Sequence, residues 1–90
     1  MGIALLRMKL MPSSPSVDLE EIKENAKKVV EEGQGKNPQF EEEPIAFGLK
    51  AVILSFQIDE SQELDPIEEN LKKIENVNSV EVLDMRRAFG

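Results

Sequence analysis

The 90-residue chain contains no cysteine and no histidine. Without cysteine it has no disulfides and no thiolate metal sites. Without histidine it lacks the commonest general base and the commonest protein ligand for metals. Catalytic triads and metal-dependent hydrolysis are therefore disfavoured, which leaves carboxylate chemistry or the binding of Mg²⁺ or Ca²⁺ by oxygen atoms.

The sequence also lacks long apolar runs and any general excess of positive charge. No segment is apolar for long enough to span a bilayer, and no signal peptide is expected. The chain has 18 acidic and 11 basic residues, a net charge of −7, and its one locally basic stretch is Met85-Arg86-Arg87. Nucleic-acid binders usually present a basic face. This balance fits a soluble protein that binds another protein, although solubility alone would also explain the charge. The protein is expected to be cytoplasmic.

Apolar periodicity predicts six elements in the order β-α-β-β-α-β. Strands are expected at residues 3–11, 38–43, 49–58 and 79–85, with helices opened by capping boxes at Asp18–Glu21 and Asp65–Glu68. The almost continuously apolar segment 49–58 should be a central strand, and the acidic segment 38–43 an edge strand. This order predicts a ferredoxin-like α+β sandwich, a four-stranded antiparallel sheet with two helices on one face. Residues 1–90 are expected to form a single domain.

Two features of the sequence suggest contacts with a partner. Phe47 lies in a segment bounded by Pro44 and Gly48, which is typical of a turn. An aromatic held out on a stiff turn suits a partner's pocket, unless it folds back over the end of the sheet. Arg86 and Arg87 begin a terminal segment without periodicity, which we expect to be disordered.

The predicted topology separates these two features. The turn should lie at one end of the sheet, and the arginines should leave it at the other. Strands of about seven residues would separate the two poles by about 20–25 Å, at ~3.3 Å per residue. A partner that touches both poles must be large, and a two-domain partner would suit.

Two acidic groups are better explained as solvated surface. Alternation along a strand sends Glu42 to the face opposite its neighbours Glu41 and Glu43, so the three carboxylates cannot converge on a cation. The acidic loop at residues 59–65 lacks the EF-hand pattern and its glycine.

An RNA-binding role for the sheet is also disfavoured. Arg7 and Lys9 should share the outer face of the sheet, which binds RNA in RRM domains of this fold. The aromatic residues that stack on bases in those domains are missing, because Phe56 falls among the core-facing positions. No phosphate-binding glycine loop is present, so a nucleotide site within the chain is not expected.

Motifs along the whole chain carry a family resemblance. The most specific is Glu43-Pro44-Ile45-Ala46-Phe47-Gly48-Leu49-Lys50-Ala51. Supporting motifs are Met11-Pro12-Ser13-Ser14-Pro15, Val17-Asp18-Leu19-Glu20 and Ser79-Val80-Glu81-Val82 running into Asp84-Met85-Arg86-Arg87. With these motifs the chain resembles the archaeal elongation factor 1-beta family, which is similar to the C-terminal catalytic domain of the eukaryotic elongation factor 1B exchange subunit.

The resemblance implies a guanine-nucleotide exchange domain that acts on the GTPase elongation factor 1-alpha in translation. Such a factor works by binding, so the chain is expected not to be an enzyme and to need no catalytic residue, metal ligand or cofactor of its own. The resemblance implies that Phe47, framed by Pro44 and Gly48, contacts the second domain of the GTPase. It further implies that Arg87, or alternatively Arg86, acts near the Mg²⁺ and switch 2 of the GTPase. Direct binding to nucleic acid or membrane is not expected, and the isolated chain is expected to be a monomer.

The chain departs from this family at two points, and other readings of the same topology exist. The eukaryotic relatives carry a lysine near the C-terminus, whereas here arginines precede Ala88-Phe89-Gly90, and the two side chains are not interchangeable. The loop at residues 59–64 also lacks the glycine frequent in relatives. An ACT-like regulatory module would share the topology but would dimerise and bind an amino acid. An acylphosphatase-like enzyme would need an arginine in the loop at residues 12–15, where there is none.

Overall fold

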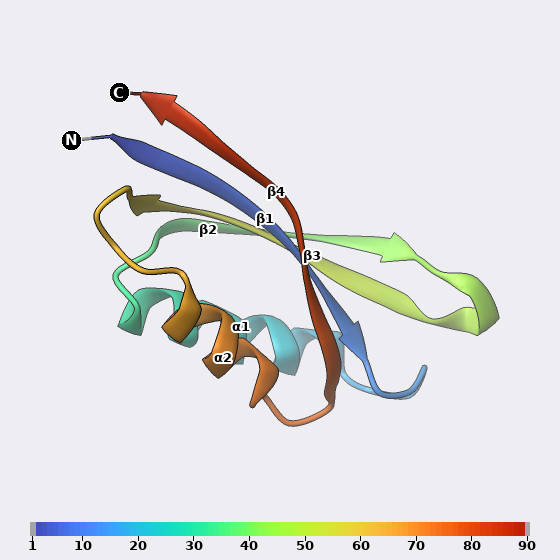
Figure 1. The fold of residues 1–90 in the computed structure, drawn as a ribbon. Helices are drawn as coiled ribbons and strands as arrows, with labels where there is room; N and C mark the ends of the chain where they lie inside the picture. The colour runs from blue at the N-terminus through green and yellow to red at the C-terminus, as the bar shows by residue number, and fades with distance from the viewer. Residues whose placement is uncertain (1, 90) are drawn as a thin grey trace.

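The computed structural model describes residues 2–89, which form one four-stranded sheet with two α-helices (Figure 1). The elements are β1 (Ile3–Pro12), α1 (Leu19–Glu32), β2 (Lys36–Pro44), the short 3-10 helix η1 (Ala46–Gly48), β3 (Lys50–Asp59), α2 (Asp65–Lys72) and β4 (Val77–Phe89). The predicted order β-α-β-β-α-β is therefore confirmed. Neither helix within residues 2–89 is long and apolar enough to cross a membrane.

The sheet has the strand order β2-β3-β1-β4, and every neighbouring pair is antiparallel. Both helices cover the same face of the sheet (Figure 1); the opposite face is called the outer face below. The two central strands are β3 and β1, while the acidic strand β2 lies at an edge, as its charge predicted. The fold is the ferredoxin-like α+β sandwich.

The hydrophobic core lies between the sheet and the two helices. Alternate residues of β1 and β3 point into it, although Ala51 and Ile53 of β3, which face the other side of the sheet, are buried as well. The buried cluster contains Ala4, Leu6, Met8 and Leu10 from β1, Val52, Leu54, Phe56 and Ile58 from β3, and Ile22, Ala26, Val30, Ile67, Leu71 and Ile74 from α1, α2 and the turn that follows α2. Burial of side chains of this size contributes about 1.5–3 kcal/mol each, so the core holds the sheet as a rigid support for its two ends.

The last strand is longer than the sequence indicated. We expected it to end at Met85 and the segment from residue 86 onward to be disordered, and this was wrong. β4 continues through Phe89, which lies opposite Ile3 of β1. Apolar periodicity reports burial, whereas strand pairing needs only a neighbouring backbone, and β1 supplies one along its whole length. Gly90 lies outside the described residues.

The beginnings of the helices differ from the predicted capping boxes. Asp18 caps α1, but its carboxylate accepts a hydrogen bond from the backbone N–H of Glu20 at 3.0 Å. The second helix is capped by the backbone of Leu64, whose carbonyl accepts from the N–H of Glu68. Asp65 therefore lies inside the first turn, where its charge still favours the helix dipole.

Candidate functional site

The hairpin between β2 and β3 projects the predicted turn beyond the rest of the sheet (Figure 1). Pro44 ends β2, and the backbone N–H of Ile45 donates to the carbonyl of Leu49 at 2.7 Å, which closes the loop. Phe47 lies at the centre of that loop with 94% of its surface exposed. The alternative in which Phe47 folds back over the end of the sheet is therefore wrong.

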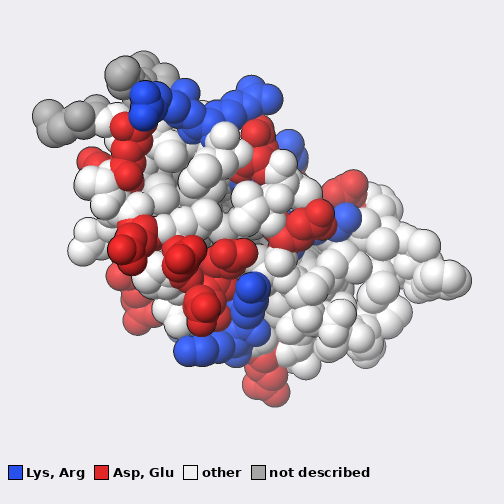
Figure 2. Space-filling model, in the orientation of Figure 1, with Lys and Arg blue, Asp and Glu red and all other residues white. Residues whose placement is uncertain are grey.

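The backbone of this turn is strained at Phe47. Both Phe47 and Gly48 adopt left-handed conformations, with φ of 65° and 77°. Glycine accepts this conformation without cost, but a bulky residue there is uncommon and loses about 1–2 kcal/mol. Residues 44–49 include no charged residue, and the projecting tip is white on the face drawn in Figure 2. The tip thus presents a large apolar ring to solvent at an energetic cost, a combination that points to function.

The two candidate arginines lie at the opposite end of the sheet, in the pairing of β4 with β1. Arg87 is opposite Ala4, and Arg86 is opposite Leu5. Consecutive residues of a strand face opposite sides of the sheet. Arg87 therefore belongs to the face that carries the helices, and Arg86 to the outer face.

Each arginine is held by one carboxylate. Nε of Arg86 lies 2.8 Å from Oδ2 of Asp84, two residues earlier in β4. Arg87 forms an ion pair with Glu60, which lies in the turn after β3. Neither acidic partner was identified from the sequence, because the arginines were assigned to a disordered tail. The register of β4 on β1 is the signal that would have revealed both pairs.

The turn that carries Glu60 is itself fixed by hydrogen bonds. The backbone N–H and the hydroxyl of Ser61 donate to Oδ1 of Asp59 at 2.9 and 2.7 Å. These bonds stabilise the carboxylate and hold the pKa of Asp59 below its usual value. The N–H of Glu60 donates to the carbonyl of Gly2 at 3.0 Å, which ties the turn to the start of the chain.

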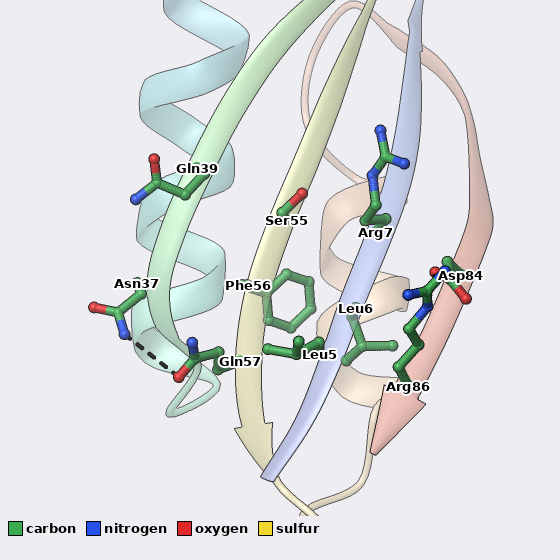
Figure 3. Close-up of a pocket in the computed structure, with 10 residues that line it drawn as sticks. All are labelled: Leu5, Leu6, Arg7, Asn37, Gln39, Ser55, Phe56, Gln57, Asp84 and Arg86. Atoms are coloured by element: carbon green, nitrogen blue, oxygen red, sulfur yellow. Dashed lines mark hydrogen bonds and ion pairs between the residues drawn. The ribbon is translucent and has the colours of Figure 1, made fainter. Parts of the chain in front are cut away.

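A shallow groove lies on the outer face beside Arg86 (Figure 3). Its volume is about 450 Å³, and its lining includes Leu5, Arg7, Gln39, Ser55, Gln57 and Arg86. The register places Gln39, Ser55 and Arg7 directly opposite one another across β2, β3 and β1. The sequence suggested Arg7 only as an RNA contact, whereas the fold places it near the middle of β1, two residues from Leu5, which lies opposite Arg86.

The remaining charged candidates occupy the positions expected for surface groups. Glu42 points to the helix side and forms an ion pair with Lys23 at 2.8 Å, which lowers the pKa of Glu42. Its neighbours Glu41 and Glu43 lie opposite Ile53 and Ala51, on the outer face. The three glutamates therefore do not converge, as alternation predicted. Phe56 is buried in the core, at 2% exposure.

These observations define a rigid α+β sandwich with an exposed aromatic at one end and a pair of arginines at the other. Residues 5–88 match the family described as the EF-1 guanine nucleotide exchange domain. The chain therefore belongs to this family of guanine-nucleotide exchange domains.

Two curated relatives give the same result over nearly their full length. The chain is 41% identical over 88 residues to "Elongation factor 1-beta" of Methanosarcina barkeri, covering 97% of this chain and 99% of that protein. It is 38% identical over 86 residues to "Elongation factor 1-beta" of Methanococcus maripaludis, covering 94% of this chain and 97% of that protein. The family and these relatives assign the chain the function of translation elongation factor 1-beta, an exchange factor acting on a GTPase.

Proposed function

We propose that the chain promotes exchange of GDP for GTP on elongation factor 1-alpha by binding that GTPase at both ends of the sheet. The observation that carries this proposal is that the strained and exposed Phe47 lies at the opposite end of the sheet from Arg86 and Arg87. β1 and β3 are each 10 residues long and span roughly 33 Å at ~3.3 Å per residue. The poles are thus farther apart than the about 20–25 Å that shorter strands would give, and a two-domain GTPase is large enough to reach both.

The two poles have different tasks in this proposal. Phe47, supported by Pro44 and Gly48, enters an apolar pocket of the second domain of the GTPase and supplies affinity. At the other end, Arg87 competes with Mg²⁺ for carboxylate or phosphate oxygens of the nucleotide site, with Arg86 as the alternative. Arginine forms bidentate hydrogen bonds with such groups.

Exchange then follows from linkage and needs no covalent step. If the factor binds the GTPase without nucleotide and Mg²⁺ more tightly than the GDP-bound form, GDP must bind the complex more weakly by the same factor. A tenfold preference corresponds to about 1.4 kcal/mol of coupling free energy. No residue has to act as a general acid or base, so the chain is not an enzyme in this proposal.

The remaining parts of the proposal describe the setting of this reaction. The exchange domain occupies residues 1–90 and acts as a monomer in the cytoplasm. It needs no cofactor, and it makes no direct contact with nucleic acid or membrane. The net charge of −7 supports the lack of nucleic-acid binding.

The linkage itself provides the test. Isothermal titration calorimetry of the chain with elongation factor 1-alpha should give tighter binding to the nucleotide-free GTPase than to the form saturated with GDP and Mg²⁺. The expected ratio is at least about fivefold. Equal affinities for the two forms would rule out this mechanism.

A further inference from the structure

The outer face of the sheet carries two rows of residues that run across its strands near the arginine end. The first row is Gln39, Ser55, Arg7 and Asp84, and the second is Gln57, Leu5 and Arg86; neighbours in each row are directly opposed in the strand pairing. The two rows line the groove shown in Figure 3. They are separated by two residues along each strand, or roughly 6.7 Å.

The two arginines of the groove differ in their pairing. Arg86 is held by Asp84, whereas Arg7 forms no ion pair within the described part of the chain. Arg7 is exposed and lies diagonally across from Arg86, a separation of about 7–8 Å between backbones. Arg7 lies directly opposite the same Asp84 in the strand pairing, so the groove holds two guanidinium groups and one carboxylate, which is paired with Arg86.

The floor of the groove is apolar, and the wall opposite the arginines is polar but uncharged. Leu5 lies between Gln57 and Arg86, with 38% of its surface exposed. Gln39 and Gln57 carry amides that both donate and accept hydrogen bonds, as a peptide bond does. An extended peptide repeats its side chains on one face every two residues, which matches the spacing of the rows.

The charge of the rest of the molecule restricts where an acidic partner can bind. Residues 18–32 and 63–75, which contain both helices and are called the helix layer here, include eleven acidic residues and five lysines. Figure 2 shows many acidic side chains over this layer with a smaller group of basic ones at its lower edge, and further basic side chains near the chain ends. A negatively charged segment is repelled by the helix layer and attracted to the groove, where Arg7 and Arg86 outnumber the one carboxylate, Asp84.

Nucleic acid fits this face less well than a polypeptide does. The two rows contain no aromatic side chain on which a base could stack. Phe56 is part of the groove lining, but only 2% of it is exposed, so its ring is not available to a base. A segment with carboxylates at alternate positions instead uses both arginines, the amides and the apolar floor.

We propose that this groove binds an acidic, extended segment of the GTPase, with Arg7 as its main cationic contact. The inference rests on the proposed function, because it takes the GTPase as the partner. It adds a third contact between the two poles, on the outer face of the sheet. Docking there would bring the GTPase across the open side of the sheet and away from the helices.

The test compares Arg7→Gln with Lys9→Gln. Lys9 lies two residues further along β1 on the same face but does not line the groove. With the wild-type chain catalysing nucleotide release, Arg7→Gln should raise KM roughly five- to tenfold at low salt and leave kcat within about twofold. This difference should shrink at 0.5 M salt because the contact is electrostatic. Lys9→Gln should keep the wild-type KM.

Two results would overturn the groove proposal while leaving the exchange function intact. One is an unchanged KM for Arg7→Gln in an assay in which Phe47→Ala raises KM. The other is an equal rise in KM for the Arg7 and Lys9 variants, which would indicate a general charge effect.

A third measurement uses an amide NMR titration of the chain with a synthetic Asp-Ala-Glu-Ala-Asp peptide. Shifts of the Gln39 and Gln57 side-chain amides that are lost in Arg7→Gln support the groove, whereas shifts caused by a poly-uridine control alone would assign it to nucleic acid and overturn the proposal.

Discussion

Arg87 and Glu60 form an ion pair that joins the end of β4 to the turn after β3, and the Glu60 carboxylate lies against Gly2. A Cβ atom added to Gly2 would overlap this carboxylate. An alanine at this position would displace the Glu60 carboxylate, which is the far end of a flexible side chain. Alternation along β4 places Arg87 on the helix side of the sheet, where it pairs with Glu60, and Arg86 on the outer side, where it pairs with Asp84. The two arginines therefore act as separate groups, although they are adjacent in the sequence.

The Arg87–Glu60 pair can be weakened at either residue that positions the carboxylate. Glu60→Gln removes the charge, and Gly2→Ala displaces the carboxylate sterically. Both substitutions should shift the Nε–H resonance of Arg87 in NMR spectra by a similar amount. Because Arg87 is 69% exposed, the free energy of unfolding should change by less than about 1 kcal/mol in Glu60→Gln. Asp84→Asn is the matched control, since it should move the Arg86 resonance and leave that of Arg87 in place.

Phe47 should show opposite effects on stability and on binding. Phe47→Gly relieves a left-handed conformation, so the free energy of unfolding should rise by up to about 1 kcal/mol in chemical denaturation. Loss of the aromatic anchor should raise KM for the GTPase roughly thirtyfold, which corresponds to about 2 kcal/mol. Phe47→Ala should raise KM equally without the gain in stability. If the glycine variant exchanged nucleotide with the wild-type KM, the anchor role would be wrong.

The arginine end should control the rate more than the affinity. Replacing Arg86 and Arg87 together by alanine should lower the maximal rate of nucleotide release, because the groups that compete with Mg²⁺ are gone. KM should rise less than in Phe47→Ala. Stopped-flow measurements at saturating factor concentration separate the two quantities. Wild-type maximal release by the double variant would exclude both arginines from the mechanism. If release by the double variant is slowed, the single variants show which face of the sheet contributes.

The core should respond to substitution far more than the two ends. Phe56 is 2% exposed and packs between the sheet and the helices. Phe56→Ala should cost about 3–5 kcal/mol of unfolding free energy, a large share of the about 5–15 kcal/mol that stabilises a typical domain. Phe47→Ala is the matched control, because it removes the same ring from an exposed site. Urea denaturation followed by circular dichroism measures both, and equal losses would contradict the assignment of Phe56 to the core.

Features that depend on local pattern were predicted well from the sequence. The alternation of Leu6, Met8 and Leu10 gave the buried face of β1, and the Pro44–Gly48 turn gave the exposed Phe47, because each signal lies within a few residues of its effect. The extension of β4 could not be predicted in this way. Arg86 and Arg87 have no apolar periodicity, and their order depends on pairing with β1, more than seventy residues earlier in the chain.

The residues of the candidate site show the same difference between local and long-range signals. Phe47 was identified because the turn is local. Glu60, Asp84 and the groove at Arg7 were missed because they depend on the register between strands distant in the sequence. The cap of α2 was also missed, because capping by the backbone of Leu64 leaves no mark on the pattern of side chains.

The most direct test of the account is the rate at which elongation factor 1-alpha releases GDP. The GTPase is loaded with a fluorescent GDP analogue, and release is followed by stopped-flow fluorescence after mixing with excess unlabelled nucleotide and increasing amounts of the chain. An exchange factor should give a release rate that rises with the concentration of the chain and saturates at least about tenfold above the spontaneous rate. A release rate that stays at the spontaneous value in the presence of micromolar chain would contradict it.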